Sequence, residues 1–242
     1  MSSEALKHLY PISVSDWFSR TVSSQLNFQA ARSIIDAHPP STGGLKVLDW
    51  GCGNLMWSLG LFPGGAITGV EISEDNLRYA RLNSNFNNPN QIFVDILYRK
   101  DIKIPEKSFD YSLCFGLIEL IDDHDFHVIF TAIYNSLKPG GKLVVTCHNW
   151  RQFSAVYLPW IFRGGYAGYA KRLGLNIQKK SLSKLALDFT SLGYDVIDYG
   201  GFNPYPSKVW KFIFTNKFYT THNLKFSSWY YTQFLVLSKP VE

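Results

Sequence analysis

The stretch L-K-V-L-D-W-G-C-G-N, at residues 45–54, decides how the rest of the chain folds. Val47 and Leu48 lie in a short apolar run, which predicts a buried strand. Gly51 and Gly53 follow, and because they lack a Cβ they permit a sharp turn and a close approach of backbone N–H groups to a ligand. We expect a short helix over residues 55–61. Strand, glycine turn and helix together open a nucleotide-binding βαβ unit.

An acid follows the glycines at the distance expected of a ribose-binding residue. Glu71 ends a second apolar run, 18 residues after Gly53. A carboxylate only accepts hydrogen bonds, so Glu71 is suited to take one from each of two ribose hydroxyls. Met56 stands where a dinucleotide fingerprint has its third glycine, and no Gly-Lys-Ser/Thr follows the turn. The turn is therefore neither a dinucleotide fingerprint nor a phosphate loop.

Four phrases of the sequence resemble the motifs of one enzyme family. D-W-G-C-G-N (49–54) and G-V-E-I-S (69–73) resemble the first two motifs of the Rossmann-like, class I, S-adenosylmethionine-dependent methyltransferases. F-D-Y-S-L-C (109–114) resembles the fourth motif, and L-K-P-G-G-K-L (137–143) is typical of the family. The family's usual first motif, D-x-G-x-G-x-G, has a third glycine that is missing here, so we expect a differently shaped helix entry. The resemblance covers residues 45–147 without a gap.

The resemblance implies that S-adenosylmethionine is the cofactor and that strand ends hold it. The implied contacts are Asp49, Gly51, Gly53, Glu71, Ile72, Asp95, Ile96 and Phe115. We expect a third strand over residues 91–94 that ends at Asp95. There a carboxylate can accept from the adenine amino group while Ile96 covers a ring face. The alternative is that Asp95 only ends the strand.

The predicted fold is α/β, a doubly wound, mostly parallel sheet of seven strands whose last strand is antiparallel, as the resemblance implies. We divide the chain into an N-terminal helical cap (1–40) and a Rossmann-like domain (41–242) with lid insertions at 150–180 and 201–228. One N-terminal helix, capped by Ser15, either packs on the sheet edge or brings Tyr10, Trp17 or Phe18 to the site. We interpret N-P-Y-P (203–206) as a turn. The other predicted helices span residues 73–85, 125–137 and 181–192, and the other strands span residues 66–70, 108–116, 142–147, 194–199 and 233–238.

Composition narrows the class of protein. Of 242 residues, 46% are hydrophobic and 18% are charged, which indicates a globular chain. The net charge of +5 is mild and no block of five like charges occurs, so nucleic acid is an unlikely partner. Cys52, Cys114 and Cys147 lack metal-ligand spacing, so we expect buried thiols and no metal site. We also expect no membrane span and a cytoplasmic location, because no signal core or apolar stretch of about 20 residues is present.

The leading hypothesis is a methyltransferase that acts on an O or N atom of a small, apolar or aromatic metabolite. The aromatic C-terminal third offers walls for such a pocket. One alternative is a nucleic-acid or protein methyltransferase, with phosphate bound by Lys171, Arg172, Lys179, Lys180 and Lys184. Another is a non-catalytic, cofactor-binding partner subunit. The oligomeric state stays open.

His148 and Glu119 are the candidate catalytic residues. Many relatives have Glu-His in the loop after the fourth strand, but here Leu120 follows Glu119 and that histidine is missing. His148 lies one residue past the expected fifth strand, and a histidine suits proton transfer near neutral pH. Alternatively, His148 only hydrogen-bonds the lid, and Glu119 either serves as the base or neutralises the cofactor's charge. His124 and His127 are weaker candidates, because we expect both to be exposed.

Overall fold

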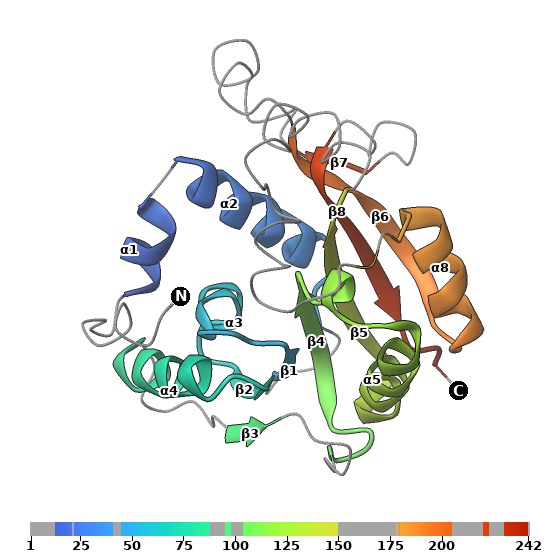
Figure 1. Ribbon diagram of the computed structural model, residues 1–242, viewed down its shortest axis with the longest axis horizontal. Coiled ribbons are helices and arrows are strands. Elements are labelled where there is room, and N and C mark those ends of the chain that lie inside the picture. Colours follow the sequence, from blue (N-terminus) through green and yellow to red (C-terminus); the bar gives the residue numbers. More distant parts are fainter. Residues whose placement is uncertain are drawn as a thin grey trace.

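A single mixed sheet with helices on both faces organises the chain (Figure 1). The computed structural model describes residues 13–20, 22–40, 45–87, 95–97, 104–149, 178, 180–204, 220–222 and 230–241. The strands are β1 (Lys46–Trp50), β2 (Ala66–Glu71), β3 (Asp95–Leu97), β4 (Phe109–Phe115), β5 (Leu137–His148), β6 (Asp195–Pro204), β7 (Thr220–Thr221) and β8 (Tyr230–Ser238). The helices are α1 (Val14–Ser19), α2 (Val22–Ala37), α3 (Met56–Leu61), α4 (Glu74–Asn87), the 3-10 helix η1 (Ile118–Leu120), α5 (Asp123–Ser136) and α8 (Leu182–Ser191).

The strand order is β3-β2-β1-β4-β5-β8-β6-β7. β3, β2, β1, β4 and β5 pair in parallel, whereas β8 is antiparallel to both of its neighbours, β5 and β6. The doubly wound α/β sheet and its antiparallel last strand are therefore as predicted. The predicted number of strands is wrong, because the two-residue β7 pairs with Gly201 and Phe202 and makes an eighth strand.

Strand order reverses at the centre of this sheet. β1 lies between β2 and β4, so the chain winds outward in one direction through β2 and β3 and in the other through β4 and β5. Crossover helices in parallel sheets leave the carboxyl ends of these strands on one edge, and ligands bind where the order reverses. The loops after β1, β2, β4 and β5 therefore form the candidate site.

Two apolar clusters fill the two faces of the sheet. One joins the sheet to α5 and α8 through Phe126, Phe130 and Phe189, and the other joins it to α2 and α3 through residues such as Ile34 and Leu59. Cys52, Cys114 and Cys147 are buried within these clusters as free thiols, as expected. Helices of the described ranges include none that is long and apolar enough to cross a membrane.

Several predicted boundaries are wrong in informative ways. The N-terminal segment forms two helices instead of one, and Ser13, not Ser15, caps the first by accepting from the Asp16 N–H at 3.0 Å. The predicted third strand, 91–94, lies outside the described residues; within them β3 begins at Asp95, where the prediction had the strand end. β6 continues to Pro204, so the first half of the N-P-Y-P run is strand; Tyr205 and Pro206 lie outside the described residues.

Candidate active site

The glycine turn after β1 has the backbone conformation that its sequence requires. Gly51 and Gly53 have φ angles of +77° and +53°. The N–H groups of Gly51 and Cys52 both donate to the carbonyl of Val70, at 2.8 and 3.0 Å, which fastens the turn to the end of β2. A Cβ on Gly51 would lie 3.3 Å from the Leu117 side chain, whereas one on Gly53 would meet no atom within 4 Å. Gly51 is thus needed for space and conformation, and Gly53 borders open space.

The missing third glycine has a conformational substitute. Leu55 stands two residues after Gly53, at the place of that glycine, and its φ of +68° is in the left-handed region. This region costs a residue with a Cβ about 1–2 kcal/mol. The Leu55 side chain is fully buried, and burial offsets that cost. The backbone therefore enters α3 in a glycine-like conformation although the residue is leucine.

Glu71 clamps the turn through its carboxylate. Oε2 accepts from the Gly53 N–H at 2.9 Å, and Oε1 accepts from the N–H groups of Ile72 and Ser73 at 2.8 and 2.9 Å. A carboxylate has about four lone-pair positions, so these three bonds leave one for a ligand. The residue predicted to bind ribose thus also orders the glycine turn before any ligand binds.

Asp49 lies beneath the turn and not on its open side. Its carboxyl group is buried and its Oδ2 accepts from the Ser58 hydroxyl of α3. Burial raises the pKa of Asp49 to about 7; the Ser58 hydrogen bond opposes this shift and the charge of Glu71 adds to it. Asp49 is therefore poised to change its protonation state near neutral pH when a cation approaches. The sequence had not indicated Ser58.

The remaining predicted cofactor residues fall into two groups. Ile72, next to Glu71, is 66% exposed. Phe115 ends β4, and its ring packs edge-on to Trp57 with 5.4 Å between the ring centroids. Asp95 and Ile96 are described by their backbone, which pairs with Gly69 and Val70 of β2. Leu97, and not Asp95, is level with Glu71, so the prediction that Asp95 lies at a strand's carboxyl end is wrong by two residues.

The N-terminal helices reach this region through aromatic rings. Phe18 is buried and stacks on Phe28 at 4.2 Å, and it contacts Trp57 at 4.9 Å between ring centroids. Trp57 in turn contacts Phe115. Phe18 thus supports a predicted cofactor residue indirectly, while Tyr10 lies outside the described residues.

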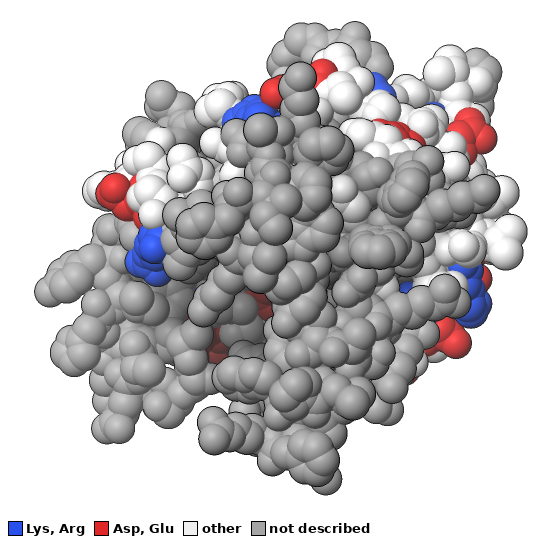
Figure 2. Space-filling view, turned by 90° about the horizontal axis from the view of Figure 1, so that it is seen from above, with Lys and Arg blue, Asp and Glu red and all other residues white. Residues whose placement is uncertain are grey.

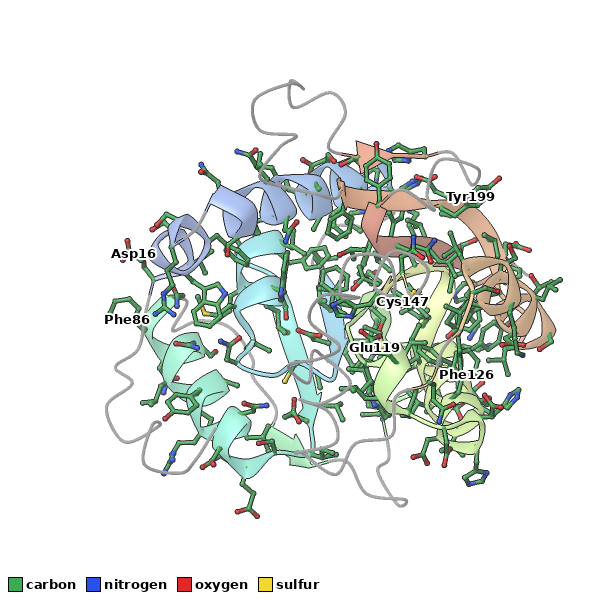
Figure 3. The ribbon with its side chains drawn as sticks, turned by 45° about the horizontal axis from the view of Figure 1, so that its top comes forward. Asp16, Phe86, Glu119, Phe126, Cys147 and Tyr199 are labelled. Atoms are coloured by element: carbon green, nitrogen blue, oxygen red, sulfur yellow. The ribbon has the colours of Figure 1, made fainter. Side chains whose placement is uncertain are left out.

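The two candidate catalytic residues meet across the ends of β4 and β5. Glu119 lies in η1, directly after β4, and His148 is the last residue of β5, one position earlier relative to the strand end than predicted. The Glu119 Oε1 atom is hydrogen-bonded to Nδ1 of His148. Figure 3 shows Glu119 in the interior close to Cys147, the neighbour of His148 in β5. The Glu119 side chain is 1% exposed and the His148 side chain 25%.

This contact decides what His148 can do chemically. A carboxylate at Nδ1 favours the tautomer with its proton on Nδ1, and the neutral ring then has its lone pair on Nε2. The same carboxylate stabilises the imidazolium that forms when Nε2 takes a proton. The other oxygen of Glu119, Oε2, is buried and has no hydrogen-bond partner among the residues that the structure describes. The contact is compatible with the predicted role of His148 as a general base.

The other titratable candidates are excluded from this role by their surroundings. Burial and the nearby negative charge of Glu119 raise the pKa of the Cys114 and Cys147 thiols, so both stay protonated. His124 and His127 are exposed on α5, as predicted. Asn149 is buried and its amide donates to the Tyr230 carbonyl at 3.0 Å, which joins β5 to β8. No cluster of metal-ligating side chains occurs among the residues that the structure describes.

Comparison with known proteins finds methyltransferases that are similar to this chain in sequence. A family model described as "Methyltransferase domain" matches residues 47–141, which contain the glycine turn, Glu71 and Glu119. A demethylmenaquinone methyltransferase from Listeria welshimeri is 27% identical over 177 residues, which cover 64% of this chain and 72% of that protein. A ubiquinone biosynthesis O-methyltransferase from Idiomarina loihiensis is 32% identical over 117 residues, which cover 48% of this chain and 47% of that protein.

The fold has close counterparts among solved structures. An S-adenosylmethionine-dependent methyltransferase from Mesorhizobium loti superposes with a TM-score of 0.61 at 16% identity, over 88% of this chain and 100% of that one. At this identity the likeness concerns the fold.

Proposed function

Because this chain belongs to the Rossmann-like, class I, S-adenosylmethionine-dependent methyltransferases and uses S-adenosylmethionine as its cofactor, we propose that it methylates a small apolar metabolite with an aromatic ring. The acceptor atom in this proposal is a ring oxygen, as in a phenol or a hydroquinone. The names of the relatives, which refer to menaquinone and ubiquinone, support a ring of this class. The observation that carries the proposal is the contact between Glu119 and His148.

The residues around the glycine turn fit the proposed cofactor. Cβ atoms built on Gly53 and Gly116 would meet nothing within 4 Å, so both glycines border open space at the carboxyl ends of β1 and β4. Glu71 has a lone-pair position left for a ribose hydroxyl, and the exposed Ile72 is placed to cover an adenine face. Asp49 beneath the turn supplies a buried acid for the cationic end of the ligand.

The chemistry explains why a base matters here. The bound cofactor supplies a methyl group already activated by its sulfonium. A phenolic hydroxyl with a pKa of about 10 is a poor nucleophile at neutral pH until it loses its proton. His148 accepts that proton at Nε2, and Glu119 holds the ring through Nδ1 and balances the positive charge that results. An amine acceptor needs this help less, so the pair favours oxygen over nitrogen.

The two rival functions have less support. Of the five cations suggested for a phosphate-binding face, Lys180 lies 2.9 Å from Asp123 and Lys184 lies 2.9 Å from Asp188. The other three lie outside the described residues. Figure 2 shows basic and acidic side chains interspersed along the described part of one face. A non-catalytic partner subunit would have no use for the pair formed by Glu119 and His148, because cofactor binding alone needs no base.

His148→Ala tests the proposal. With methyl-labelled cofactor and a hydroquinone acceptor, kcat should fall by about 10²–10⁴-fold, the usual contribution of a positioned base. The dissociation constant of the cofactor should not change. His124→Ala, on the exposed start of α5, is the matched control and should leave kcat unchanged. A loss of only two- or threefold at every pH would mean that alignment alone drives the reaction, and label found in RNA or protein would favour the alternative acceptors.

A further inference from the structure

Two buried side-chain atoms lack hydrogen-bond partners within the described ranges, and they have opposite charge. They are Oε2 of Glu119 and Nζ of Lys180. Their segments are joined, because the N–H of Gln178 donates to the backbone carbonyl of Glu119 at 2.8 Å. The backbone at Gln178, two positions before Lys180, therefore contacts the same turn, η1, that carries the candidate catalytic carboxylate.

Lys180 anchors this segment to the start of α5. Its side chain is 6% exposed, and Nζ lies 2.9 Å from Oδ1 of Asp123 and 4.3 Å from the centroid of the Phe126 ring. The ammonium lowers the pKa of the Asp123 carboxyl by pairing closely with it. An ion pair with Asp123 and a cation–π contact with Phe126 thus hold Lys180 in place. The Asp123 side chain itself is mostly exposed.

A second buried lysine, Lys239, has the contacts expected of a structural role. Lys239 donates to the carbonyls of Tyr134 and Leu137, both at 3.0 Å, and lies over the Tyr134 ring. Its ammonium is compensated by hydrogen bonds. Lys180 has no such carbonyl partners, so its burial costs free energy that its contacts only partly offset. A residue that is costly to bury and adjacent to the site is a candidate for a role in function.

We propose that Lys180 is a positioning residue for the reaction. By contacting Asp123 and Phe126 of α5, Lys180 keeps the nearby Gln178 N–H on the carbonyl of Glu119 and holds η1 where the Glu119 carboxylate meets His148. The proposal rests on the proposed function of His148 as the base. Lys180 acts in this proposal through Glu119.

Lys180→Met separates this role from a purely structural one. Methionine keeps the apolar stem and removes the charge. The free energy of unfolding should stay the same or rise, and cofactor affinity should not change. Yet kcat should fall by about 10- to 100-fold, because a small displacement of a catalytic group has a cost of this size. Lys180→Arg should restore most of the activity, and Lys184→Met, an exposed lysine of α8 paired with Asp188, should leave kcat unchanged.

The state of His148 gives a readout that needs no turnover. At a pH where the ring is neutral, the nitrogen NMR signals of His148 in wild-type protein without ligand should show mainly the tautomer with its proton on Nδ1, and in Lys180→Met they should show a mixture of the two tautomers. Unchanged signals together with unchanged kcat would overturn the proposal, as would a loss of kcat that only follows a loss of stability. If His148→Ala is fully active while Lys180→Met still alters the His148 signals, the proposed function of His148 as the base is wrong, although Lys180 does hold the pair formed by Glu119 and His148.

Discussion

Two carboxylates at the same edge of the sheet, those of Glu71 and Glu119, have different kinds of hydrogen-bond partner. Glu71 has both oxygens bonded to backbone N–H groups, from Gly53, Ile72 and Ser73. Glu119 has one oxygen on a titratable ring and the other without a partner. The cofactor half of the site is thus ordered by backbone and needs no change of charge. The proposed acceptor half is held by a contact between two side chains.

The largest expected effect comes from exchanging each acid for its amide. Glu119→Gln should lower kcat by about 100-fold or more, because a neutral amide does not stabilise the imidazolium, and should leave cofactor affinity intact. Glu71→Gln, the matched change in the other half, should weaken cofactor binding and spare kcat at saturating cofactor. Steady-state kinetics and calorimetry on both variants check this. If both variants lower the same parameter, the division into two halves is wrong.

The second-largest expected effect concerns the glycine turn after β1. Gly51→Val should weaken cofactor binding by about 100-fold. The left-handed backbone at this position costs valine ~1–2 kcal/mol, and the added side chain would also crowd Leu117 and the ligand. Gly64→Val is the control: Gly64 has a φ of +81° and no atom near its missing Cβ, so it has the strain but lies away from the site. Comparable losses of cofactor affinity in the two variants would show that strain alone, and not the site, is responsible.

Glu71→Ala should have a somewhat smaller effect on the same quantity. Loss of a charged hydrogen-bond acceptor should weaken S-adenosylmethionine binding by roughly 1–3 kcal/mol, measured by calorimetry. The freed N–H of Gly53 should also exchange with solvent faster. Glu74→Ala, at the exposed first turn of α4, should change neither. An unchanged affinity in Glu71→Ala would remove the ribose contact from the proposal.

The smallest expected effect is a pH dependence from Asp49. With a pKa of about 7, this acid is mostly protonated at pH 6 and ionised at pH 8. If the ionised form binds the cationic end of the cofactor, affinity should rise about tenfold over this range, and binding below pH 7 should release a proton. Calorimetry in two buffers of different ionisation enthalpy counts that proton. Asp49→Asn should flatten the dependence, and a wild-type affinity that is already flat would contradict the assignment.

Local backbone chemistry explains which parts of the sequence were predictive. Gly51, Gly53 and Glu71 could be placed because positive φ angles demand glycine and because strand, turn and acid follow one another within one βαβ unit. β7 was missed since a strand of two residues has no periodicity to detect. Both Ser13 and Ser15 suit a helix cap, and only the fold decides between them.

The contact between Glu119 and His148 could not be predicted from local sequence. Each residue was a candidate from its position after a strand, yet their meeting depends on the parallel register of β4 and β5, in which Phe115 pairs with Thr146. The hydrogen bond from Gln178 to Glu119 spans an even longer stretch of chain and has no sequence signal. The predicted division at residue 40, the lid insertions and the cytoplasmic location stay predictions.

The position of β8 has a consequence for how the chain is made. Residues 142–148 of β5 pair with β8, and so does β6 on its other side. While a ribosome is still adding residues 230–238, two inner strands of the finished sheet present bare edges, which invite association with other chains. The cofactor turn can form early from contiguous sequence, but the sheet closes only after β8 is released. We therefore expect nascent chains of this protein to depend on chaperones until β8 has left the ribosome.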